Sequence, residues 1–105
     1  TKRPFYTMPD MDNRKWTKSF DLLFRGIEVT TGGQRIHDYE LLKENMKKFG
    51  LVPDNYLSYL DIFKYGMPPH GGLAVGLERL TMKICDLNNI KEASLFPRDR
   101  RKLQP

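Results

Sequence analysis

The sequence has one cysteine, two histidines and no long hydrophobic run. Because a single thiol cannot form an intramolecular disulfide, Cys85 excludes a disulfide framework. There is no signal-peptide pattern, and no apolar stretch is long enough to span a bilayer. Histidine and cysteine are too few to build a zinc cluster, and internal repeats and low-complexity tracts are missing as well. These absences predict a soluble, cytoplasmic protein.

What remains is sufficient for a folded domain. The chain has 105 residues, of which 39% are hydrophobic and 11% aromatic, enough for a core in one domain covering residues 1–105. It begins at Thr1 rather than Met, and its opening segment is already apolar and extended. This opening suggests a piece taken from a larger protein.

Positive charge is in mild excess. The net charge of +5 and the pI near 9.4 are compatible with a polyanionic partner such as RNA, although charge alone does not identify one. Arg98, Arg100, Arg101 and Lys102 cluster near the end of the chain. This cluster is interpreted either as a positive edge that contacts RNA or as a solvated tail.

Strands are expected in the first third of the chain. Aromatic residues favour a strand over residues 5–8, and polar turn formers predict a loop over residues 9–18 in which Trp16 is packed. Alternation of apolar residues then predicts a pair of strands over residues 20–25 and 27–31.

Gly26 separates this pair and predicts a bulge or a tight turn. Strict alternation would place Glu28 and Thr30 on one face of the second strand and Val29 and Thr31 on the other. A twist or bulge near the following double glycine would change that register.

Two helices are predicted next. Asp38 is a suitable N-cap for a helix that continues to about residue 48 and stops at Gly50. A second helix is predicted over residues 53–64, with proline at its start. The apolar residues spaced to form the faces of these helices are Leu41, Leu42, Met46, Phe49, Tyr56, Leu60 and Phe63.

Glycine and proline dominate residues 66–72, which predict a structured loop. A short apolar strand over residues 73–75 and a helix over residues 77–85 follow. In that helix, the residues expected to face inward are Leu77, Leu80 and Ile84. Strands interspersed with helices predict an α+β domain on a mainly antiparallel sheet.

The segment GGLAVGLER joins the last strand to the last helix. Gly72 and Gly76 would let the backbone approach a ligand, and a helix N-terminus attracts phosphate. Arg79 in the first turn can make forked bonds to phosphate oxygens. By itself, this pattern fits a tight turn with an exposed Glu78–Arg79 surface equally well.

Four segments together resemble one family. HGGLAVGLERL at residues 70–80 resembles motif 3 of class II aminoacyl-tRNA synthetases, and FDLLFRGIEVTTGGQRIHDYELL at 20–42 resembles their archaeal and eukaryotic aspartyl members. RPFYTMPDMDN at 3–13 and LFPRDRRKLQP at 95–105 resemble the flanking pieces. The resemblance covers nearly the whole chain and implies the α+β class II catalytic fold.

The resemblance implies a site for ATP and Mg²⁺. Glu28 is similar to the carboxylate that coordinates Mg²⁺ on the ATP phosphates, with Asp21 assisting. Thr31 stands where relatives usually have serine, whose hydroxyl serves both the metal and the amino acid. The residues implied to contact ATP, besides Glu28, are Gly76, Leu77, Glu78 and Arg79, with Arg79 at the γ-phosphate.

The resemblance also implies an aspartate site. Arg35 is similar to the arginine that holds the side-chain carboxylate in a bidentate pair; taken alone, it would be a surface arginine. Arg3 aligns with a basic residue, often lysine, that faces the same carboxylate. No residue is implied as a general acid or base, and His37 and His70 are expected to be structural.

The implied reaction forms aspartyl-adenylate from aspartate and ATP and transfers aspartate to tRNA. Motif 1, motif 2 and the anticodon-binding domain of the family are not in the sequence, so this piece is expected to be inactive alone. The complete enzyme is expected to be a homodimer.

Three other interpretations remain open. The chain could belong to an asparaginyl-tRNA synthetase, to a relative that amidates aspartate without tRNA, or to a truncated non-catalytic paralogue that binds RNA.

Overall fold

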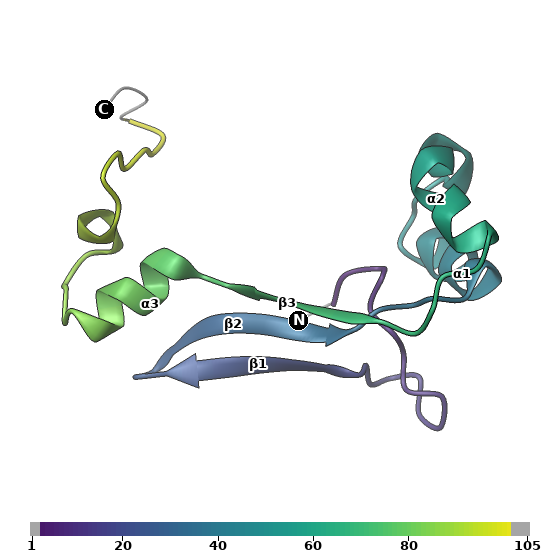
Figure 1. Cartoon of the computed structure of the whole chain (residues 1–105), viewed down its shortest axis with the longest axis horizontal. Helices are drawn as coiled ribbons and strands as arrows, with labels where there is room; N and C mark the ends of the chain where they lie inside the picture. Colours follow the sequence, from purple (N-terminus) through teal and green to yellow (C-terminus); the bar gives the residue numbers. More distant parts are fainter. Residues whose placement is uncertain (1–2, 102–105) are drawn as a thin grey trace. The chain divides into compact units, whose positions relative to one another are not determined.

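The computed structural model describes residues 3–101, so Lys102 and the end of the basic cluster lie outside the described residues (Figure 1). The chain forms two compact units. Residues 3–20 and 32–72 form the first, which we call the helical unit, and residues 21–31 and 73–101 form the second, the hairpin unit. No helix within residues 3–101 has the length and apolar character needed to cross a membrane.

Three strands form one sheet in the order β1-β2-β3: β1 (Ser19–Phe24), β2 (Ile27–Gln34) and β3 (Gly71–Val75). Between β1 and β2, Arg25 and Gly26 have φ values of 44° and 82°. Positive φ at both central residues is typical of a type I′ turn, whose twist suits a two-residue hairpin. The tight turn expected at Gly26 is confirmed, and β3 begins two residues earlier than expected.

The pairing of β2 with the β1 side of the hairpin is offset by one residue. Counting from the turn, Gln34 should face Thr17, but its N–H donates to the carbonyl oxygen of Lys18 (2.8 Å). The consecutive side chains of Val29 and Thr30 are both buried, which breaks the alternation of a regular strand. Together these observations indicate a β-bulge at Val29–Thr30.

The helical unit contains the core. Helix α1 (Tyr39–Lys48) begins as predicted, because Asp38 Oδ1 accepts a hydrogen bond from the Leu41 N–H (2.7 Å). It ends before Gly50, whose φ of 77° suits a C-terminal glycine. The predicted second helix is split into a 3₁₀ turn, Pro53–Tyr56, and α2 (Leu57–Lys64).

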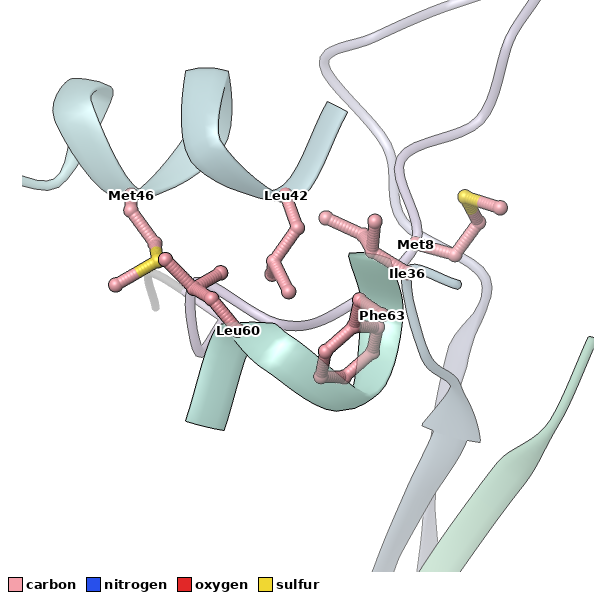
Figure 2. Close-up of a cluster of buried hydrophobic side chains, with 6 residues drawn as sticks. All are labelled: Met8, Ile36, Leu42, Met46, Leu60 and Phe63. Carbon is pink, nitrogen blue, oxygen red and sulfur yellow. The ribbon is translucent and has the colours of Figure 1, made fainter. Parts of the chain in front are cut away.

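Figure 2 shows how these helices pack. Leu42 and Met46 of α1 face Leu60 and Phe63 of α2, and all four are buried. The core is completed by residues from outside the helices, Met8 and Ile36. The apolar spacing of both helices therefore predicted the faces that meet, apart from Phe49 and Tyr56, which are exposed.

The N-terminal predictions are wrong in two places. Residues 5–8 form no strand, since this segment takes part only in one isolated bridge, between Thr7 and Arg35. Trp16, expected to be packed, is 69% exposed in the surface loop over residues 9–18.

The hairpin unit contains α3 (Leu77–Ile84) and a 3₁₀ turn, Ile90–Ala93. Arg25 connects the β1–β2 turn to α3, because its guanidinium donates to the Lys83 carbonyl oxygen (2.8 Å). A cation is favourable at this end of a helix. The expectation that Leu77 and Ile84 face inward is wrong: they are 68% and 63% exposed, because none of the described residues covers that face.

Candidate functional site

Three of the predicted site residues meet in the hairpin unit. Thr31 Oγ1 donates a hydrogen bond to Glu28 Oε1 (2.6 Å). Arg79 Nη1 donates to the Glu28 backbone oxygen (2.9 Å) and lies 3.8 Å from Glu28 Oε1. All three side chains are part-exposed, so a ligand can reach them.

The bulge explains why Glu28 and Thr31 are in contact. In a regular strand their side chains would point to opposite faces, and their Cα atoms would be about 10 Å apart. The extra residue at Val29–Thr30 turns Thr31 to the face of Glu28, so the expectation of opposite faces is wrong. With the same offset, Asp21 of β1 lies opposite Thr31, on the face that carries the cluster.

The donor set of this cluster suits a hard cation. A carboxylate and a hydroxyl are oxygen ligands, and Mg²⁺ is commonly held by one or two carboxylates together with substrate phosphates. Among residues 3–101, no group of three or more His, Cys, Asp or Glu side chains could hold a metal. The residues therefore fit a cation shared with a phosphate ligand rather than a closed protein site.

The start of α3 lies beside this cluster. The Gly76 N–H donates to the Val29 carbonyl oxygen (2.7 Å), which ties the helix start to β2. No side chain caps the helix, so the N–H groups of its first turn have no side-chain acceptor. Leu77 and Glu78 of that turn are exposed, and Arg79 is the member of the turn that contacts Glu28.

Arg35 lies in the helical unit, one residue after β2. Its guanidinium carbon is 5.2 Å from the centre of the Tyr6 ring, within the range of a cation–π contact. On Gly72, a Cβ atom would lie 3.2 Å from Nη2 and 3.3 Å from Nε of Arg35. Burial raises the pKa of the Tyr59 phenol above its ordinary 10.0, and the Arg35 charge acts against this rise.

The remaining candidates occupy varied positions. Arg3 is half-buried at the start of the described chain, in the helical unit. His70 Nδ1 lies 3.0 Å from the Pro68 carbonyl oxygen, as expected of a loop-ordering residue. His37 Nδ1 is buried and has no hydrogen-bond partner.

Sequence reasoning missed two neighbours of Arg35. Tyr6 lies in the segment RPFYT, which was interpreted as a strand, and Gly72 was considered only for its approach to a ligand. The available signal was an aromatic residue close to Arg3, but nothing local relates it to a side chain 29 positions later. Only the tertiary fold brings them together.

Comparison with known proteins identifies the family. The family model described as "tRNA synthetases class II (D, K and N)" matches residues 1–100. The chain belongs to this family. The resemblance noted in the sequence is thus confirmed, and so is the α+β class with an antiparallel sheet.

Relatives within the class II synthetases are close in sequence. The chain is 58% identical over 103 residues to an aspartate–tRNA(Asp/Asn) ligase of Thermus thermophilus, covering 98% of this chain and 24% of the relative. It is 54% identical over 103 residues, with the same coverage, to the enzyme of that name from Methanocaldococcus jannaschii. The chain therefore spans about a quarter of the length of these relatives.

Solved synthetase structures agree. The aspartyl-tRNA synthetase of Entamoeba histolytica matches with a TM-score of 0.93 and 45% identity, over 98% of this chain and 21% of that one. An asparaginyl-tRNA synthetase of Pyrococcus horikoshii matches with a TM-score of 0.91 and 34% identity, over 98% of this chain and 25% of that one.

Proposed function

We propose that this chain supplies metal, phosphate and amino-acid contacts to an enzyme that activates aspartate with ATP and charges tRNA with it. The observation that carries the proposal is the contact of Glu28, Thr31 and Arg79. It combines hard oxygen ligands with a guanidinium, as a metal–triphosphate complex requires. The names and high identities of the aspartate ligases favour aspartate as the amino acid.

In the proposed reaction, an aspartate α-carboxylate oxygen attacks the α-phosphorus of ATP. The bond to the bridging oxygen breaks, pyrophosphate leaves with that electron pair, and aspartyl-adenylate remains. A hydroxyl at the 3′ end of tRNA then takes the aspartyl group and releases AMP. The reaction needs positioning and charge neutralisation more than a protein base.

Different residues of this chain would bind the metal ion and the phosphates. Glu28 and Thr31 would hold Mg²⁺ together with the phosphates, and Asp21 would support it from β1. Bound Mg²⁺ would neutralise charge on the β- and γ-phosphates. Arg79 would exchange its contacts with Glu28 for the γ-phosphate, while the uncapped first turn of α3, from Gly76 to Glu78, would lie against the nucleotide.

Two of the proposed amino-acid contacts, Arg35 and Arg3, lie in the helical unit. Arg35 would pair with the side-chain carboxylate through two N–H groups, and Arg3 would add a second positive charge. Thr31 would also serve the amino acid. We further propose that the complete enzyme is a cytoplasmic homodimer.

The test uses a graft. The matching segment of the Thermus thermophilus ligase is replaced by this chain, and ATP–pyrophosphate exchange is measured at varied aspartate and ATP. Arg35→Ala should raise the KM for aspartate about 100-fold, because two charge-assisted hydrogen bonds are lost, and should leave the KM for ATP within about threefold.

Arg14→Ala is the matched control, since Arg14 is also a part-exposed arginine of the helical unit but pairs with Glu44. It should leave both KM values unchanged. Equal weakening of aspartate and ATP by Arg35→Ala would contradict the assignment.

An asparagine-specific synthetase is the second candidate, supported by the asparaginyl enzyme among the similar structures. The same graft supplied with asparagine separates the two. Exchange stimulated by asparagine rather than aspartate would support the second candidate.

A further inference from the structure

We propose that Tyr6 and Gly72 form a slot that fixes the orientation of the Arg35 guanidinium, which makes Tyr6 a positioning residue for selecting a carboxylate side chain. The inference deepens the proposed function and rests on it. It concerns neighbouring residues of the helical unit.

The backbone on each side of Arg35 is held in place. Arg35 forms an isolated antiparallel bridge with Thr7, and the Ile36 N–H donates to the Tyr6 carbonyl oxygen (2.8 Å). On the other side, the Arg35 N–H donates to the His70 carbonyl oxygen (2.9 Å). The segments that carry Tyr6 and Gly72 are therefore both bonded to the segment that carries Arg35.

Tyr6 supplies one wall of the slot. The guanidinium carbon of Arg35 lies 5.2 Å from the ring centre, where the electron-rich face attracts a cation. The ring is itself restrained by Phe5, at 5.5 Å between ring centres and close to edge-on. The ring centre of Phe5 in turn lies 6.3 Å from that of Tyr59, so the wall is part of an aromatic cluster.

Gly72 supplies the second wall. A Cβ atom there would lie 3.2 Å from Nη2, 3.3 Å from Nε and 3.4 Å from Cζ of Arg35. These distances differ by only a few tenths of an ångström, so Nη2, Nε and Cζ of the flat group all lie against the glycine. A Cβ atom at this position would therefore require the guanidinium to shift by a few tenths of an ångström.

A guanidinium held in this way presents its N–H groups in a fixed direction. Arginine is useful for binding carboxylates because two parallel N–H groups match two oxygens. An amide offers one acceptor and one donor, so the same fork leaves one N–H facing another donor. A fixed orientation prevents Arg35 from turning to avoid this mismatch, which favours aspartate over asparagine.

The test compares Tyr6→Leu, Tyr6→Phe and Gly72→Ala in the Thermus thermophilus graft. Tyr6→Leu should raise the KM for aspartate about 3- to 30-fold, the range expected for a lost cation–π contact, and change kcat less than threefold. Tyr6→Phe keeps the ring and should stay within about twofold. Gly72→Ala should also raise the KM for aspartate, and it should lower the ratio of the exchange rate with aspartate to the exchange rate with asparagine.

Tyr65→Leu is the matched control, since Tyr65 also lies near a cation, Lys64, but is 82% exposed. Binding of a non-reacting aspartyl-adenylate analogue, measured by calorimetry, gives a second readout that does not need turnover. It should weaken with Tyr6→Leu and not with Tyr65→Leu.

Two results would overturn this inference and leave the proposed function standing. One is an unchanged KM for aspartate in Tyr6→Leu. The other is a rise of this KM in Tyr6→Phe as large as in Tyr6→Leu, which would implicate the hydroxyl. A parent graft that neither exchanges with aspartate nor binds the analogue would overturn the proposed function, and this inference with it.

Discussion

At the residue scale, three of the residues predicted to bind metal or ATP contact one another. Glu28 accepts hydrogen bonds from Thr31 at its side chain and from Arg79 at its backbone. A phosphate would accept from Arg79 more strongly than the Glu28 backbone oxygen does, because both partners of the new bond are charged. The carboxylate of Glu28 and the hydroxyl of Thr31 are thus already side by side, which reduces the cost of ordering these two proposed metal ligands on binding.

Variants of Thr31 test whether its hydroxyl binds the metal ion. Thr31→Val keeps the shape of the side chain and removes the oxygen, so the concentration of Mg²⁺ needed for half-maximal exchange in the graft should rise about tenfold. Thr31→Ser keeps the hydroxyl and should change this Mg²⁺ concentration less than threefold. Titration of Mg²⁺ at saturating ATP measures both. A valine variant with the parent's Mg²⁺ requirement would count against a metal role for Thr31.

At the element scale, the sequence predicted correctly those elements whose turn, start or end depends on residues close by in the chain. Alternation predicted the hairpin, Gly26 predicted its turn, and Asp38 with Gly50 predicted both ends of α1. Segment 5–8 was predicted wrongly because its aromatic residues pack against the core instead of pairing along a strand.

The bulge in β2 was predicted only in part. The double glycine suggested a change of register, but its place at Val29–Thr30 follows from pairing with β1 and from burial, which no local pattern reports. This one extra residue brings Thr31 to Glu28. It therefore decides whether the predicted metal ligands can act together.

The N-cap of α1 is an element-scale test of stability. Asp38→Ala should lower the free energy of unfolding by about 1 kcal/mol, because the Leu41 N–H loses its acceptor. Asp38→Asn retains an acceptor and should lower it by less than half as much. Urea denaturation of the graft followed by circular dichroism measures both. Equal losses would show that charge, and not capping, is what Asp38 contributes.

At the scale of the whole molecule, the two units differ in how well they cover their apolar side chains. The helical unit buries a cluster that joins both of its helices. In the hairpin unit, large apolar side chains are exposed on β1, β3 and α3, among them Leu22, Leu73 and Leu77. An exposed apolar surface of this kind is typical of a region that packs against other protein.

We therefore expect the 105-residue chain alone not to form aspartyl-adenylate. The family resemblance places the arginine that holds the α-phosphate in motif 2, which is not in this sequence. ATP–pyrophosphate exchange by the purified chain should be at background, with the graft as positive control. Exchange by the chain at a rate approaching that of the graft would refute this expectation.

The sequence alone determined the family, the α+β class and the identity of the candidate residues, because these depend on motifs and on local spacing. Tertiary structure decided which of those residues meet. Glu28 meets Thr31 because a bulge changes the register of β2, and Arg35 meets Tyr6 and Gly72 because backbone hydrogen bonds join three distant segments. Both are consequences of pairing between segments, and such pairing leaves no local signal in the sequence.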